Sequence, residues 1–371
     1  MSNPPILRQT GFTALLLLLG TTGGLVAGHA GAPMPFMLGA LAVTALISGF
    51  AGQFFPRGYV FPQRFRLLFI GIIGVAIGAR VNPELLRPGP GIALSFGAVT
   101  LFVVLAQLAN NAIFRKVGGL DRPTAWFSGS PGGLLEAVTM GEAAGADIRM
   151  LTLLQFLRII LVVSLVPIAF SIREGVPVGS AAGLSMGQGV ASPAGIALVL
   201  VLAVLGSALA LRLRLPAGQL TGPLILAAAF GWSGVADIVI PGWMMAAAQV
   251  VVGVSLGARF HGVRAGLLMR AAGLSLMSVS TMLALGVGLA EAVHLATGLK
   301  LDTLIISYAP GGVTEMGLVA ISLSADPALV ALHHLYRITL TVVFLALGKR
   351  LGVLPGTALP QKPEPAPDGN D

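Results

Sequence analysis

Apolar runs recur along most of the chain, and short segments containing glycine, proline or arginine separate them. In the first half the runs cover residues 12–28, 35–50, 65–79, 91–113 and 150–171, with a glycine- and proline-interrupted segment at 123–144. In the second half they cover 194–211, 217–235, 243–258, 266–290 and 328–348, with an interrupted segment at 302–324. An apolar helix of about 20 residues spans the ~30 Å hydrocarbon core of a bilayer. The pattern predicts about ten transmembrane helices plus two broken or re-entrant helical hairpins.

The composition indicates an all-α polytopic membrane protein. Hydrophobic residues make up 56% of the chain and charged residues only 10%, whereas soluble domains carry about 25% charged residues. The net charge of +8 comes from arginines in the loops, and no nucleic-acid-binding motif is present, so we expect the lipid bilayer as a partner and no direct nucleic acid. The chain has no cysteine and no histidine–carboxylate cluster with metal-ligand spacing, so we expect no metal site and no cofactor.

The two halves of the chain resemble each other at a fixed offset of 179 residues (259 − 80 for the first pair). The segment VAIGAR reappears as VSLGAR, and SPGGLLE reappears as APGGVTE. The charged residues that coincide are Arg80 with Arg259, Glu136 with Glu315, Asp147 with Asp326 and Arg158 with Arg337. Since charged residues are rare here, these coincidences indicate an internal repeat. We predict a first membrane repeat at 1–174, a linker at 175–192, a second repeat at 193–354 and a disordered tail at 355–371.

The distribution of lysine and arginine predicts the topology. If both interrupted segments are re-entrant and the N-terminus is cytoplasmic, 16 basic residues lie inside, 4 lie outside and 2 lie within helices; if both segments span, the count is 12 inside and 8 outside. The positive-inside rule favours the re-entrant arrangement. Each half then has five spanning helices, so the second half is inverted relative to the first. We expect a bacterial inner membrane protein with both termini in the cytoplasm.

The interrupted segments are the candidate site. Pro131-Gly132-Gly133 and Pro310-Gly311-Gly312 break the helix, and broken backbone inside a membrane is tolerated only where protein buries it or where it lines a cavity. A helix that starts after each glycine pair directs its N-terminal amides towards an anion. The predicted substrate- or ion-binding residues are Ser130, Pro131, Gly132, Gly133, Glu136, Gln155, Arg158, Pro310, Gly311, Gly312, Glu315, His334 and Arg337.

Depth places a glutamate and an arginine of each half together. At ~1.5 Å per helical residue, Glu136 and Arg158 both lie about 13 Å from the surface turn, and the repeat places Glu315 and Arg337 alike. Buried charges of this kind mark a pathway or a coupling site. Three alternatives stay open: the pairs merely staple their hairpins, the glutamates cap their own helices, or the adjacent histidines 333 and 334 serve an intramembrane hydrolase. Asp147 and Asp326 are predicted to be helix caps.

The two copies of Ser/Ala-Pro-Gly-Gly-x-x-Glu, each followed by a Gly/Ser-Ala-Asp turn and a helix with an internal arginine, resemble the AbrB duplication family of Gram-negative membrane proteins. The resemblance covers about residues 10–354. The family has been labelled both a transcriptional regulator and an ammonia monooxygenase, and neither label follows from these residues. The broken Pro-Gly-Gly helices are also distantly similar to those of bile-acid sodium symporters, whose broken helices span the membrane.

These observations predict a secondary transporter of a small solute, with an organic anion as the favoured class, coupled to protons or sodium. The alternative is a membrane sensor or regulatory protein that has a transporter-like fold and affects gene expression indirectly. We expect no enzymatic activity, because no nucleophile elbow or phosphate loop is present. The expected partners are a small-molecule or ion substrate, and a homodimer is left open.

Overall fold

The computed structural model of the 371-residue chain describes residues 6–56, 58–81, 89–178, 192–234, 237–323 and 325–348. Most of the predicted linker and the whole of the predicted tail lie outside these ranges. The α-helices are α1 (Ile6–His29), α2 (Pro35–Phe50), α3 (Gln63–Gly78), α4 (Pro90–Lys116), α5 (Arg122–Ser128), α6 (Leu134–Ala143), α7 (Ile148–Glu174), α8 (Pro193–Arg212), α9 (Gly218–Trp232), α10 (Gly242–Gly257), α11 (Ala265–Thr297), α12 (Leu301–Tyr308), α13 (Val313–Ser322) and α14 (Pro327–Leu347). The described ranges contain no β-strand.

Seven helical segments are long and apolar enough to cross a membrane: α1, α4, α7, α8, α11, α14 and Gly242–Phe260, which joins α10 to the short 3-10 helix after it. The prediction of an all-α polytopic membrane protein is confirmed. The other three predicted spans are α2, α3 and α9, which have 15 or 16 residues. At 1.5 Å per residue such helices cover about 23 Å, somewhat less than the hydrocarbon core.

Local sequence sets where several helices begin. The carboxylate of Asp147 accepts hydrogen bonds from the backbone N–H groups of Arg149 and Met150, and Asp326 does the same for Ala328 and Leu329. Both aspartates are therefore helix N-caps, as predicted. Helices α2, α4, α8 and α14 carry proline at the first turn, where a missing N–H is harmless.

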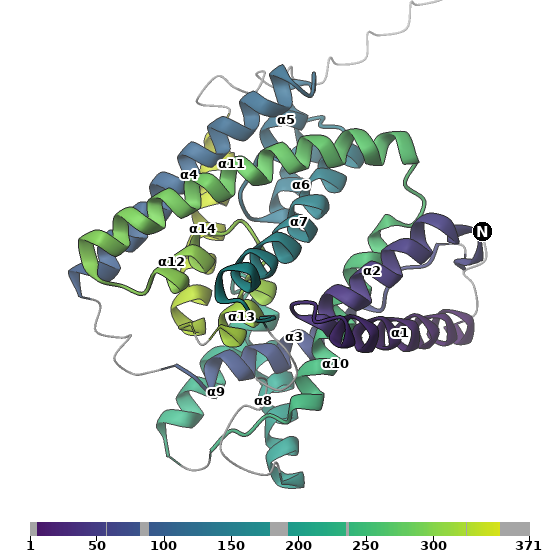
Figure 1. Cartoon of the computed structure of the whole chain (residues 1–371), viewed down its shortest axis with the longest axis vertical. Coiled ribbons are helices and arrows are strands. Elements are labelled where there is room, and N and C mark those ends of the chain that lie inside the picture. Colours follow the sequence, from purple (N-terminus) through teal and green to yellow (C-terminus); the bar gives the residue numbers. More distant parts are fainter. Residues whose placement is uncertain are drawn as a thin grey trace, which may run out of the picture.

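The helices form two bundles that lie side by side (Figure 1). Helices α1–α3 and α8–α10 pack together in one, which we call the scaffold bundle. Helices α4–α7, α11, α12 and α14 form the other, which we call the hairpin bundle because it holds both broken segments. The long helices α4 and α11 pack against each other along it (Figure 1). Each bundle contains helices from both halves of the sequence, so the predicted repeats are not separate spatial units.

Packing within the scaffold bundle is reciprocal between the halves, because α3 packs on α9 and α10 packs on α2. Small residues make both contacts: a Cβ on Gly74 would lie 2.6 Å from the carbonyl oxygen of Leu220, and Gly253 meets the carbonyl oxygen of Met37 in the same way. Gly74 and Gly253 are again 179 positions apart. Close backbone approach at small residues is the usual basis of helix association in membranes, where the hydrophobic effect between helices is weak.

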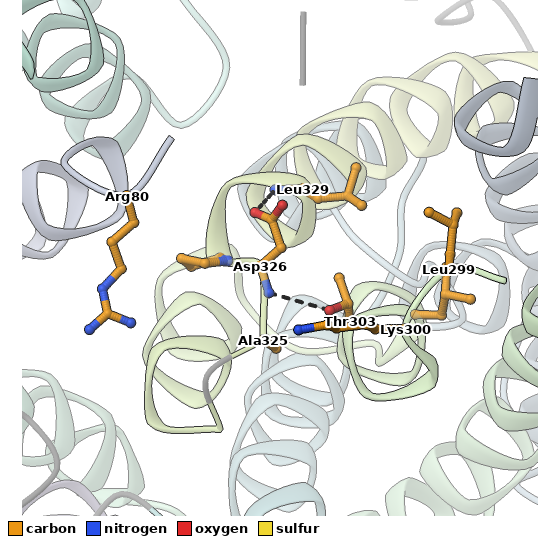
Figure 2. Close-up of a pocket in the computed structure, with 9 residues that line it drawn as sticks. Arg80, Leu299, Lys300, Thr303, Ala325, Asp326 and Leu329 are labelled. Carbon is orange, nitrogen blue, oxygen red and sulfur yellow. Dashed lines mark hydrogen bonds between the residues drawn. The ribbon is translucent and has the colours of Figure 1, made fainter. Parts of the chain in front are cut away.

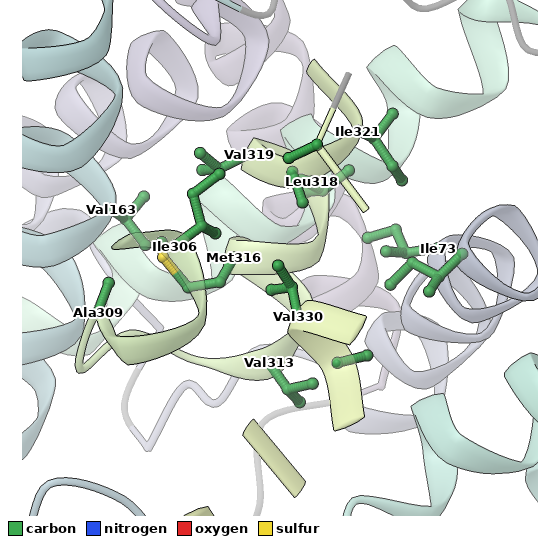
Figure 3. Close-up of a cluster of buried hydrophobic side chains, with 14 of the residues drawn as sticks. Ile73, Val163, Ile306, Ala309, Val313, Met316, Leu318, Val319, Ile321 and Val330 are labelled. Atoms are coloured by element: carbon green, nitrogen blue, oxygen red, sulfur yellow. The ribbon is translucent and has the colours of Figure 1, made fainter. Parts of the chain in front are cut away.

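Helix α13 lies between the two bundles and is buried along its length from Val313 to Ile321. Its side chains pack against Ile73 of α3, Val163 of α7 and Val330 of α14 (Figure 3). The corresponding helix of the first half, α6, buries only Ala137 and Gly141. The two broken segments therefore have unequal surroundings in this structure.

The glycine contacts of the scaffold bundle give a stability prediction. We expect Gly74→Val and Gly253→Val each to lower the free energy of unfolding by about 1–3 kcal/mol, because the added side chain overlaps a backbone carbonyl. The thermal midpoint of the purified protein in detergent measures the effect. Gly273→Val is the matched control, since nothing lies within 4 Å of a Cβ at that helical glycine. Equal midpoints for all three variants would contradict the packing argument.

Candidate functional site

Each broken segment is a hairpin that returns to the level at which it begins. The backbone N–H of Asp147, just after α6, donates to the hydroxyl of Thr124 at the start of α5, with an N···O distance of 2.7 Å. The backbone N–H of Asp326 donates to Thr303 at 3.3 Å in the second half. A segment whose ends lie side by side cannot cross a bilayer. This geometry fits the re-entrant prediction rather than the spanning alternative.

The break between α5 and α6 exposes a series of backbone carbonyls, and buried polar side chains bind them. Gln155 of α7 donates from Nε2 to the carbonyl oxygens of Phe127 (3.0 Å) and Ser128 (3.2 Å) and to the hydroxyl of Ser130 (2.8 Å). Arg158, one turn further along α7, donates from Nη1 to the carbonyl oxygen of Ser130. The break is thus held by donors that do not depend on any ligand.

Two residues of α4 complete this set of donors. Gln107 donates to the carbonyl oxygen of Trp126 at 2.7 Å, and Asn110 donates to that of Gly129 at 3.0 Å. Both side chains are buried. The sequence prediction missed them, although a glutamine and an asparagine in the middle of an apolar span are a signal in their own right.

The break between α12 and α13 has fewer donors. Arg337 of α14 donates from Nη1 to the carbonyl oxygen of Ala309 and from Nη2 to that of Gly311, the latter at 2.6 Å. The residues 179 positions after Gln107 and Asn110 are Gly286 and Leu289, whose side chains have no hydrogen to donate. One arginine therefore holds the second break where four side chains hold the first.

The two arginines are buried near each other without a carboxylate partner. Arg158 is 6% exposed and Arg337 is 1% exposed, and they lie close enough for their charges to interact. The only ion pairs of the described ranges join Arg173 to Glu174 and to Asp302. The predicted Glu136–Arg158 and Glu315–Arg337 ion pairs are therefore wrong, because the guanidinium groups bind backbone carbonyls instead. In both arginines Nε is buried and has no hydrogen-bond partner.

The glutamates turn towards the start of their own helices. The Oε2 atom of Glu315 lies against Gly312, where a Cβ would overlap it, and Oε2 of Glu136 lies 3.4 Å from a Cβ position on Gly133. Both are in the first turn of their helix, which favours the capping alternative. The cation that acts electrostatically on Glu315 is Arg66 of α3, which the sequence prediction did not include.

The two breaks meet at Arg337. A Cβ on Gly132, at the tip of the first hairpin, would lie 3.7 Å from Arg337 Nε and 3.4 Å from the hydroxyl of Thr341. The neighbouring prolines at 131 and 310 are buried, and Gly133 has a φ of +62°, a conformation that favours glycine. The structure thus brings the tip residues of the first half and Arg337 of the second half together.

A buried hydrogen-bond network lies one helical turn before Arg337 on α14. His333 bonds through Nε2 to the hydroxyl of Ser95 at 2.7 Å and through Nδ1 to the carbonyl oxygen of Leu329 at 2.8 Å. Ser95 also contacts the Tyr308 hydroxyl at 2.9 Å, and Phe96 stacks on the imidazole. Both ring nitrogens of His333 are therefore satisfied. Among the residues that the structure describes, no group of three or more metal-ligating side chains is arranged to hold an ion.

A pocket of about 370 Å³ opens beside the start of α12 and α14. Figure 2 shows Arg80 and Lys300 on opposite sides of Asp326, whose carboxylate is engaged as a helix cap. Leu329, which also lines the pocket, is the residue whose carbonyl oxygen binds His333. Leu329 therefore belongs both to the pocket and to the buried network.

The fold and the site define a polytopic helical membrane protein with two broken helical hairpins that converge on buried arginines. A family model described as "Transition state regulatory protein AbrB" matches residues 36–351, and the chain belongs to this AbrB family. It is 23% identical over 345 residues to YhjN of Bacillus subtilis (strain 168), covering 89% of this chain and 90% of the relative. It is 25% identical over 342 residues to a protein of Escherichia coli (strain K12) named "Putative regulator AbrB", covering 90% and 93%.

The arginine–carbonyl contacts give a second prediction. We expect Arg337→Met to lower the free energy of unfolding by about 1–3 kcal/mol for each of the two carbonyls that it strands, at Ala309 and Gly311. Arg149→Met, at an exposed position of α7, is the control and should leave the thermal midpoint nearly unchanged. Glu315→Gln combined with Arg337→Met should be additive, since the two side chains form no ion pair. Strong coupling in that double-mutant cycle would contradict the contacts described above.

Proposed function

We propose that this protein is a secondary transporter of a small organic anion in the bacterial inner membrane, coupled to protons or sodium and working by alternating access. The observation that carries the proposal is the pair of buried arginines, each with an unpartnered Nε, where the two broken hairpins meet. Two positive charges away from water without a carboxylate are unfavourable unless an anion joins them. A carboxylate accepts two hydrogen bonds and matches the guanidinium group in charge and geometry.

The unequal surroundings of the two hairpins support two alternating states. Helices α13 and α14 pack on α3, whereas α6 and α7, their counterparts, make at most marginal contact with α10 in the described part of the chain. If the halves exchange conformations, α6 packs on α10 and α13 is released from α3. An inverted pair of repeats gives two such states, each opening the shared site to one side.

The basic pocket supports an entry route for an anion. Arg80 and Lys300 are exposed and line it, so a negatively charged solute accumulates there before it moves inward. Under the predicted topology both residues face the periplasm.

The family description and the name of the Escherichia coli relative favour a second candidate, a membrane-bound regulator. A sensor of this kind binds an effector or a partner and moves no solute. Neither candidate involves catalysis at the arginines, so we propose that the protein is not an enzyme.

Binding and uptake measurements separate the two candidates. We expect one or more small mono- or dicarboxylates to raise the thermal midpoint and to show counterflow in proteoliposomes. Arg158→Lys and Arg337→Lys keep the charge but remove Nε–H, so each should weaken binding about 10- to 100-fold through one lost charged hydrogen bond. Arg149→Lys is the control. A stabilising carboxylate without counterflow would identify a sensor, and no stabilising anion at all would remove the proposed site.

Cross-linking tests the second conformation, and the absence of native cysteine makes it direct. Ile77 of α3 and Gly317 of α13 are in contact in this structure, and their repeat counterparts are Leu256 of α10 and Val138 of α6. We expect cysteines at 77 and 317 to cross-link, and cysteines at 138 and 256 to cross-link as well in membranes, because the second state forms that contact. Leu135→Cys paired with Leu256→Cys is the negative control, since Leu135 is 73% exposed. Cross-linking of the first pair alone would oppose alternating access.

A further inference from the structure

One of the differences between the residues that hold the two breaks introduces a titratable side chain. Gln155 of α7 and His334 of α14 are 179 positions apart, each one helical turn before the arginine of its half. The Gln155 amide always has hydrogens to donate, and it donates them to two carbonyls of the first break. An imidazole donates from a given nitrogen only when that nitrogen is protonated. The second break thus has a proton-dependent residue where the first has a permanent donor.

The contacts of His334 fix which of its nitrogens carries hydrogen. Nδ1 lies 2.9 Å from the carbonyl oxygen of Val330, an acceptor, so Nδ1 is the donor and Nε2 is a bare lone pair when the ring is neutral. Nε2 is completely buried and has no hydrogen-bond partner. The repeat places His334 one turn before Arg337, which holds the Ala309 carbonyl oxygen of the second break. A bare lone pair on Nε2 cannot donate to the carbonyl oxygens of this break, whereas a protonated Nε2 can.

The adjacent histidine does not share this property. His333 uses both ring nitrogens, one on the Ser95 hydroxyl and one on the Leu329 carbonyl, so its neutral form is complete. The charged groups that act on His334 are Arg337 and His333 on its own helix. The other titratable groups on helices packed against α14 are Asp302 and Tyr308 of α12, Glu315 of α13, Glu136 and Glu142 of α6, Arg64 and Arg66 of α3, and Arg115 and Lys116 of α4.

We infer that His334 is the proton-binding residue of the central site, and that its protonation closes the α12–α13 break while its deprotonation releases it. The inference rests on the proposed function, because it selects the proton over sodium as the coupling ion and places it beside the anion site. An imidazolium next to Arg337 adds a further positive charge, so protonation is favoured when an anion is bound and disfavoured when the site is empty. Because this coupling is reciprocal, a bound proton raises the affinity for the anion by the same factor as a bound anion raises the affinity for the proton.

A matched pair of cysteine probes tests the closing of the break, without added anion and with succinate present to favour protonation. Ser128 and Ser307 are repeat counterparts at the ends of α5 and α12, both buried and both with a hydroxyl that makes no hydrogen bond. Serine to cysteine is nearly isosteric, so Ser128→Cys and Ser307→Cys report the accessibility of the first and the second break. The measurement is the rate of modification by a small charged methanethiosulfonate between pH 5 and 9. The ratio of the two rates removes the dependence of thiol reactivity on pH.

We expect the ratio of Ser307→Cys to Ser128→Cys modification to fall as the pH falls, by up to about tenfold per pH unit if one proton controls the opening. In His334→Gln, which copies the first half, Ser307→Cys should react as slowly as Ser128→Cys at every pH. In His334→Ala, which has no donor, it should react rapidly at every pH. His294→Gln, on α11, is the control and should leave the pH dependence intact.

Three outcomes overturn the inference: a ratio independent of pH, a Ser307→Cys that is never modified, or an unchanged pH dependence in His334→Gln. None of them depends on transport. If a carboxylate shows counterflow and any of these outcomes is also observed, the protein is a transporter whose proton-binding residue is not His334. If the opening of the break depends on pH but no counterflow is observed, His334 is a proton switch and the protein is not a transporter.

Discussion

The structure depends on one constraint: backbone carbonyls that leave helical geometry inside an apolar environment need hydrogen-bond donors. Each break exposes such carbonyls at the centre of the hairpin bundle, and in each half an arginine 28 residues further along the chain supplies donors. An unsatisfied carbonyl there is strongly destabilising, since no water reaches it. The packing of α7 and α14 against their own hairpins follows from this requirement, because the arginine must stand level with the break. The aspartate caps and the Thr124 and Thr303 hydroxyls then fix the other end of each hairpin.

Satisfying the carbonyls with arginine rather than with a neutral amide has an electrostatic consequence. Guanidinium offers five hydrogens in a planar fork, so one side chain serves Ala309 and Gly311 together. The same choice leaves two positive charges buried near each other, while the nearest glutamates are turned to their own helix ends. Structure and proposed function are therefore linked. The arginines that stabilise the breaks also leave a positive charge that favours a bound anion, and their unpartnered Nε–H groups are the donors that such an anion would face.

Much of this arrangement could be predicted from the sequence, because its main residues occur once in each half at a constant offset. The Pro-Gly-Gly breaks, the arginines and the aspartate caps stand out as rare residue types at a constant offset in an apolar chain. The Glu–Arg ion pairs were wrong because depth along a helix says nothing about the direction of a side chain; Glu136 and Glu315 lie at the right level but point to their own glycines. The mixing of both halves in each bundle was also unpredictable, since it depends on close contacts such as Gly74 with Leu220, which carry no pairwise signal in one sequence.

The differences between the halves carry as much meaning as the repeat. Two identical halves would hold their breaks with equivalent sets of donors. Instead, the second half has Gly286, Leu289 and His334 where the first half has Gln107, Asn110 and Gln155. These changes all remove permanent donors from one break and none from the other. Fewer permanent donors hold the carbonyls of the second break, whereas the apolar packing of α13 is more extensive than that of α6. A break that depends on one arginine and carries a titratable donor is the part of the molecule where binding of a proton can change the conformation.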